Sequence, residues 1–116
     1  MTPQASWELE FSDNICILRL MAHLRFGLRM EDVSAVKMEM ANRNCTILLA
    51  DLGAMSMICS SEIGFLAGLY CSLAKIPDGR FILIGPNRRV RQVLDLTRLS
   101  TIVEVAPDLE SALAAL

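Results

Sequence analysis

Two short apolar runs, each followed by a helical pattern, limit the folds open to this chain more than any other feature. Residues 45–53 read CTILLADLG and residues 80–85 read RFILIG, and both runs end at a glycine. Such runs are typical of strands that are buried on both faces of a sheet. Helical patterns alternate with these strands along the chain, which favours a largely parallel sheet in an α/β fold.

The N-terminal residues predict an antiparallel hairpin at the start of this sheet. Residues 7–11, WELEF, alternate apolar and acidic side chains, as a half-buried strand does. The turn signal SDN at residues 12–14 separates them from a second strand at residues 15–24. A last, short strand is predicted at residues 101–105, TIVEV.

About four helices complete the predicted domain, which spans residues 1–116 without an internal linker or repeat. The predicted helices cover residues 28–42, about 61–76, 86–100 with Asn87 as N-cap, and a final segment capped by Asp108. The sequence therefore predicts one α/β domain with a mixed, mostly parallel sheet and an N-terminal β-hairpin.

Composition excludes several classes of function. Hydrophobic residues make up 53% of the chain and mean hydropathy is +0.44, which indicates a doubly covered sheet, an apolar partner surface, or both. A net charge of −2 does not indicate the basic surface that binding of nucleic acid requires. The longest stretch without a charged residue, 63–74, is too short to span a membrane, and residues 1–11 do not resemble a signal peptide. We therefore expect a cytoplasmic protein.

The four cysteines, Cys16, Cys45, Cys59 and Cys71, form no CxxC pair and lie in apolar stretches. We expect buried free thiols in a reducing compartment. With a single histidine in the chain, no metal site and no cofactor are predicted. A catalytic Cys59 at a helix N-terminus is the enzymatic alternative, but no base is identifiable near it, so the sequence favours a protein that is not an enzyme.

Two adjacent serines in MICSSEIG, residues 57–64, lie where a strand-like run meets a helical pattern. A serine at an N-cap accepts a hydrogen bond from a free backbone N–H, so we expect Ser60 or Ser61 to cap the helix. The spare hydroxyl is a candidate for phosphorylation, because a helix N-terminus favours an anion. The sequence alone leaves the cap and the switch as alternatives.

The helix that follows has a second apolar group outside its main stripe. Ile63, Leu66, Tyr70 and Leu73 share one stripe, which must pack on the sheet. Phe65 and Leu69 fall on or near the opposite side. Either a neighbouring element buries them, or they are anchors for a partner.

Residues 46–116 resemble the STAS domain, the fold of bacterial anti-sigma factor antagonists. In that family a buried strand with an Asp-Leu step leads to a D-S-[ST]-G-[LIV]-G motif that opens a helix. Here Asp51-Leu52 precedes CSSEIG at residues 59–64, and the tail contains the similar patterns VxxVLxLT and DxExAL. Cys59 replaces the motif Asp, Glu62 replaces its Gly, and Arg25 stands where the family has an acidic residue after the second strand.

This resemblance implies a regulator of transcription that acts in signal transduction by binding a protein partner. In the family, a kinase that is itself an anti-sigma factor phosphorylates the serine that Ser60 matches. The implied partner is therefore an anti-sigma factor or a serine kinase-like protein, and a second copy of the chain is a further candidate. The expected contact surface comprises Ser60, Ser61, Glu62, Phe65 and Leu69. The alternative is a STAS scaffold that is not phosphorylated, in a signalling or lipid-transport complex, which the altered motif favours.

Overall fold

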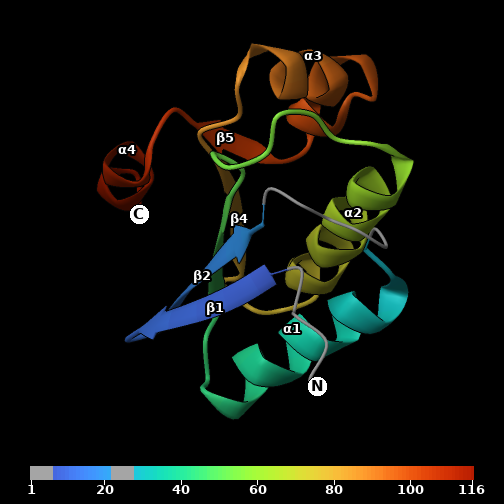
Figure 1. The fold of residues 1–116 in the computed structure, drawn as a ribbon. Helices are drawn as coiled ribbons and strands as arrows, with labels where there is room; N and C mark the ends of the chain where they lie inside the picture. Colours follow the sequence, from blue (N-terminus) through green and yellow to red (C-terminus); the bar gives the residue numbers. More distant parts are fainter. Residues whose placement is uncertain (1–6, 22–27) are drawn as a thin grey trace.

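The computed structural model describes residues 7–21 and 28–116, which form one five-stranded sheet with helices on both faces (Figure 1). In chain order the elements are β1 (Trp7–Ser12), β2 (Ile15–Leu20), α1 (Met30–Asn42), β3 (Ile47–Asp51), α2 (Ser60–Ala74), β4 (Arg80–Ile84), α3 (Arg88–Leu96), the 3₁₀ helix η1 (Leu99–Thr101), β5 (Glu104–Ala106) and α4 (Leu109–Ala114). The predicted alternation of strands and helices is confirmed, with η1 as an addition before β5.

The strands lie in the sheet in the order β1-β2-β3-β4-β5. β1 pairs antiparallel with β2 through a turn in which Asp13 has a φ of 53°. β3, β4 and β5 then add parallel to β2, one beside the next. Because crossovers between parallel strands are right-handed, α1 and α2 fall side by side on one face. The predicted fold class, a mixed and mostly parallel sheet with an N-terminal hairpin, is confirmed.

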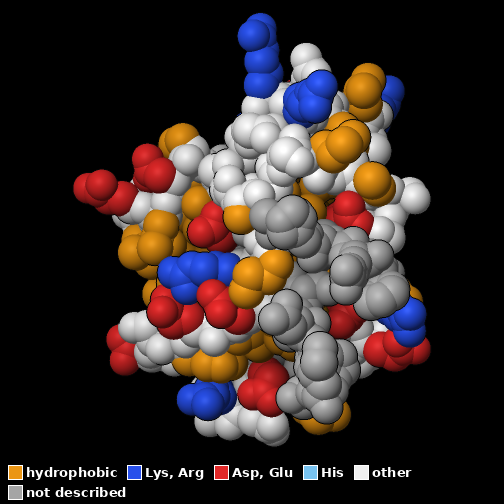
Figure 2. Space-filling view, in the orientation of Figure 1, with side chains coloured by type: hydrophobic (Ala, Val, Ile, Leu, Met, Phe, Trp, Pro, Cys, Tyr) orange, Lys and Arg blue, Asp and Glu red, His pale blue; other side chains and the backbone are white. Residues whose placement is uncertain are grey.

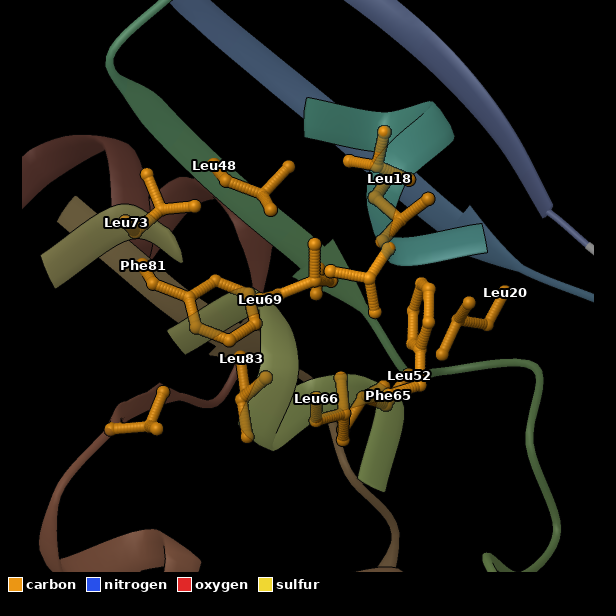
Figure 3. Close-up of a cluster of buried hydrophobic side chains, with 14 of the residues drawn as sticks. Leu18, Leu20, Leu48, Leu52, Phe65, Leu66, Leu69, Leu73, Phe81 and Leu83 are labelled. Carbon is orange, nitrogen blue, oxygen red and sulfur yellow. The ribbon is translucent and has the colours of Figure 1, made fainter. Parts of the chain in front are cut away.

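The larger hydrophobic core lies between this face and helices α1, α2 and α3 (Figure 3). Alternate side chains of the central strands point into it, including Leu18, Leu48, Phe81 and Leu83. The helices supply the other half, including Val36, Leu66, Leu73, Val90 and Leu94. Each fully buried side chain of this size stabilises the fold by about 1.5–3 kcal/mol, so this layer dominates the stability of the domain.

The opposite face carries a smaller core under α4, formed by Ile17, Leu49, Ile82, Ile84 and Ala112. Arg80 links β4 to β5 and to the end of α4. Its guanidinium donates to both carboxylate oxygens of Glu104, at 2.6 and 3.2 Å, and to the carbonyl oxygen of Ala115 at 2.9 Å. The short helix is therefore tied to the sheet at its C-terminal end as well as through its apolar side chains.

Several predicted boundaries differ from the structure. Residues 57–59 belong to a loop, so the strand-like run before the serines was wrongly interpreted. The strand predicted at 101–105 begins only at Glu104. The predicted end of the second strand, at residues 22–24, and the substitution at Arg25 lie outside the described residues. No helix in the described ranges has the length and apolar character needed to cross a membrane.

Candidate functional site

The candidate site is the loop of residues 52–59 together with the first turn of α2, at the C-terminal end of β3 (Figure 1). The backbone N–H of Leu52 donates to the carbonyl of Ile84 at 2.9 Å, which extends the β3–β4 contact by one residue. Asp51 then accepts a hydrogen bond from the N–H of Gly53 at 2.8 Å. These bonds turn the chain out of the sheet, and the buried side chains of Met55 and Ile58 hold the loop on the core.

Asn87 joins this loop to the start of α3. Its side-chain oxygen accepts from the N–H of Val90 at 2.8 Å, which confirms the predicted N-cap. Its amide nitrogen donates to the carbonyl oxygens of Met55 and Ser56, each at 3.1 Å. The same residue thus caps one helix and restrains the loop before another, a role that the sequence pattern did not indicate.

The N-cap of α2 is Cys59, so the prediction that Ser60 or Ser61 caps this helix is wrong. Cys59 has the extended backbone of an N-cap residue. Its N–H donates to the carboxylate of Glu62 at 2.8 Å, which is the return half of a capping box. Ser60 and Ser61 follow the N-cap as the first two residues of the helix, so neither of them caps it.

The two serines have different surroundings. Ser61 is partly buried and its hydroxyl donates to the carboxylate of Glu62. Ser60 is exposed, and its hydroxyl has no hydrogen-bond partner in the part of the chain that the structure describes. Glu62 itself is only 6% exposed, and each of its two carboxylate oxygens accepts one hydrogen bond, from Cys59 and from Ser61. Of these three side chains, Ser60 is the most accessible to a partner.

Phe65 and Leu69, expected as partner anchors, are buried in the core at 2% and 0% exposure. Of the two alternatives, burial by a neighbouring element is confirmed, because α1 packs against α2 on that side, and the assignment of this pair to the partner surface is wrong. Figure 3 shows both side chains in the cluster that contains Leu20 and Leu52. Neither side chain can touch a partner without opening the domain.

Other side chains provide the exposed surface around Ser60. Met57, in the loop just before α2, is 55% exposed and is the large exposed hydrophobic residue nearest to Ser60 in the sequence. On the far side of the Asn87 contact, α3 begins with the exposed residues Arg88 and Arg89. Figure 2 shows Lys and Arg side chains gathered at the top of the molecule, over α3. The loop before α2 and the start of α3, which Asn87 joins, therefore expose an apolar side chain and two basic ones.

The cysteines fall into two classes, although burial was expected for all four. Cys16 and Cys45 are buried, whereas Cys59 and Cys71 are exposed. Burial, together with the neighbouring Cys45, raises the pKa of the Cys16 thiol to about 12. Cys59 is exposed because the run that contains it is a loop and not a buried strand.

Comparisons with solved structures agree with this architecture. An anti-sigma-factor antagonist (STAS) domain protein from Planctomyces limnophilus has a TM-score of 0.78 and 17% identity over 96% of this chain and 97% of that one. An anti-sigma factor antagonist from Mycobacterium paratuberculosis has a TM-score of 0.74 and 21% identity, covering 94% and 91%. Bacillus SpoIIAA in its phosphorylated form has a TM-score of 0.64 and 21% identity, covering 94% and 97%. At these identities the likeness establishes the fold.

The family assignment comes from the sequence itself. No curated protein matches the chain significantly. The family model of the STAS domain, however, matches residues 6–112, which is nearly the whole chain. The match includes the β1–β2 hairpin, strands β3 and β4, and the first turn of α2. This chain therefore belongs to the STAS domain family.

Proposed function

We propose that this protein is a regulatory interaction module of the anti-sigma factor antagonist type, without catalytic activity of its own. Its partner would be a kinase-type anti-sigma factor that contacts the loop of residues 52–59 and the first turn of α2. The observation that carries the proposal is the exposed Ser60 at the first position of α2, after an Asp51-Leu52 step that matches the family pattern. SpoIIAA, which shares the fold, exists in phosphorylated and unphosphorylated forms.

The physical basis of the switch would be charge at the edge of an apolar contact. Phosphorylation of Ser60 adds about −1.5 to −2 charges at pH 7. Met57, three residues before the start of α2, would have to be desolvated by the partner, and a phosphate on Ser60 makes that desolvation costly. The unmodified protein would therefore bind, and the phosphorylated protein would dissociate.

A second candidate function follows from Glu62. Its carboxylate occupies the first turn of α2, where it accepts from the Cys59 N–H and the Ser61 hydroxyl. A phosphate on Ser60 would share the helix N-terminus with this negative charge, and repulsion would oppose it. A STAS scaffold that binds its partner without phosphorylation is the function that this arrangement favours.

Incubation with each candidate anti-sigma kinase and ATP, followed by mass spectrometry, separates the two functions. We expect one phosphate on the wild type and on Ser61→Ala, and none on Ser60→Ala. Ser61→Ala is the matched control because it removes the neighbouring hydroxyl. Binding is then measured by calorimetry, where Ser60→Asp and Met57→Ala should each weaken the complex by more than about 1 kcal/mol.

Two outcomes would count against the first function. A partner that binds the wild type and Ser60→Asp equally, and transfers no phosphate, would support the scaffold instead. If Ser60→Asp and Met57→Ala both bind a captured partner like the wild type, the start of α2 is not the contact surface. Thermal melts of each variant exclude unfolding as the cause of weaker binding.

A further inference from the structure

A cavity of about 430 Å³ opens between the C-terminal halves of α1 and α2, at the end of the molecule away from Ser60. Its wall is largely apolar and includes Met40, Leu69, Leu73 and Ile76. Small-molecule sites in proteins have volumes of roughly 300–1,000 Å³, mostly apolar walls and a few polar groups. The cavity has the size and the lining of such a site.

Gly68 is a point of close approach between α1 and α2, next to the cavity along α2. At Gly68 the helices approach until an added Cβ atom would lie 3.1 Å from Cγ2 of Val33. One turn further along α2, Ser72 lines the opening, and its hydroxyl donates to the carbonyl oxygen of Gly68 at 3.1 Å. Beyond this contact along α2, the space between the two helices forms the cavity.

The charged group in the described lining of the cavity is positive. Lys37 of α1 lines it and is exposed, and it forms no ion pair with any residue in the described ranges. The described lining includes no Asp or Glu. The remaining polar groups in the wall are neutral, among them Asn44 and Thr46. An apolar hollow with one ammonium group beside it complements an apolar chain that ends in an anion.

We propose that this cavity binds a small amphiphile with an alkyl chain and a carboxylate head group, of the medium-chain fatty acid class. At roughly 30 Å³ for a group the size of a water molecule, the volume holds about a dozen such groups, which suits a chain of about eight carbons. The chain lies against Leu73 and Ile76, and the carboxylate pairs with Lys37. The proposal is independent of the partner assigned to Ser60.

The first test is a titration of the folded protein with octanoate, below its micellar range, followed by NMR of the backbone amides. We expect shifts at the amides of Ala41, Thr46 and Ser72, with a Kd on the order of 100 µM to 1 mM. Lys37→Gln should raise that Kd about threefold to fivefold, while the Kd of octanol, the uncharged analogue, changes less than about twofold. Lys75→Gln, which alters the only other lysine of the chain, is the matched control and should bind like the wild type.

The second test fills the cavity. Ser72→Leu places a larger side chain in the wall and should raise the Kd of octanoate and of octanol about tenfold or more. Cys71→Leu changes the adjacent, exposed residue outside the wall and should leave both values unchanged. The proposal is overturned if octanoate at about 10 mM leaves these amides unshifted. It is also overturned if Ser72→Leu, shown to be folded by its thermal melt, binds like Cys71→Leu. Equal loss of octanoate and octanol in Lys37→Gln would contradict the carboxylate pairing.

Discussion

The amide nitrogen of Asn87 lies 3.1 Å from the carbonyl oxygen of Met55, and this contact ties the start of α3 to the loop before α2. Asn87→Asp separates the two roles of this side chain. Aspartate keeps the oxygen that caps α3 but loses the two N–H donors that hold the loop. We expect a loss of about 1–2 kcal/mol in the free energy of unfolding, together with faster hydrogen exchange at residues 55–59. Urea unfolding and exchange mass spectrometry measure the two effects.

Asn87→Ala is the companion variant, since it removes the cap as well as the loop contacts. Its loss should exceed that of Asn87→Asp by about 1 kcal/mol, and exchange should quicken at the start of α3 too. If the aspartate variant leaves exchange at residues 55–59 unchanged, the loop is held by its buried side chains alone.

Phe65→Ala tests the position of Phe65 in the core. Because this ring is 2% exposed, its removal should cost about 3–5 kcal/mol of unfolding free energy, measured by chemical denaturation. Met57→Ala is the control on the surface and should change stability by less than about 0.5 kcal/mol. A Phe65→Ala variant as stable as the wild type would place the ring outside the core.

Glu62→Gln should destabilise the start of α2. The carboxylate accepts from both the Cys59 N–H and the Ser61 hydroxyl, and an amide has only one oxygen to accept such bonds. We expect a loss of about 1–3 kcal/mol in urea unfolding, since a buried polar group loses a charged partner. Glu110→Gln makes the same change at an exposed site in the first turn of α4 and should have little effect. Equal stability of the two variants would mean that the Glu62 bonds contribute nothing.

The thiols should react in two groups. In the native protein we expect iodoacetamide to modify Cys59 and Cys71, and to modify Cys16 and Cys45 only after denaturation. The reactive species is the thiolate, and burial both blocks access to Cys16 and raises its pKa to about 12. Peptide mapping after timed alkylation gives the order of modification. Rapid modification of Cys16 in the native state would contradict its burial.

The Asp108 cap should weaken in acid. Its carboxylate accepts from the N–H of Ser111 at 2.7 Å, and this bond holds the pKa of Asp108 below its ordinary value. A carboxyl group with a lowered pKa in the folded state contributes stability above its unfolded pKa and loses that contribution as pH falls through the folded value. Asp108→Asn keeps an N-cap that does not titrate, so urea unfolding should show a smaller loss between pH 7 and pH 3 than in the wild type. If the free energy of unfolding falls by the same amount between pH 7 and pH 3 in both proteins, Asp108 does not have this role.

Much of the fold could be predicted because local and tertiary signals agree. The runs at residues 47–51 and 80–84 are apolar throughout and form central strands. Asn87 and Asp108 are strong N-cap residues, and both cap the predicted helices. In these places the side chain that determines local structure is also the one that the tertiary fold requires.

The surface of the candidate site was harder to predict, because it depends on a neighbouring helix. Phe65 and Leu69 lie outside the stripe that faces the sheet, and only the position of α1 buries them. A signal was present: α2 is apolar on nearly all sides, which is typical of a helix that is buried all round. The exposure of Met57 and Cys59 had no such signal, since an apolar run in a loop resembles a strand in sequence.

The strand order has a consequence for the way this chain acquires its structure. Each strand pairs with the one before it in the sequence, so no pairing has to wait for a distant segment of the chain. Closing each successive pair involves one hairpin turn or one crossover, which keeps the entropy lost at each step small. The β1–β2 pair is local, whereas each parallel pair waits for a whole crossover helix, so we expect the N-terminal hairpin to form before the parallel strands add to it.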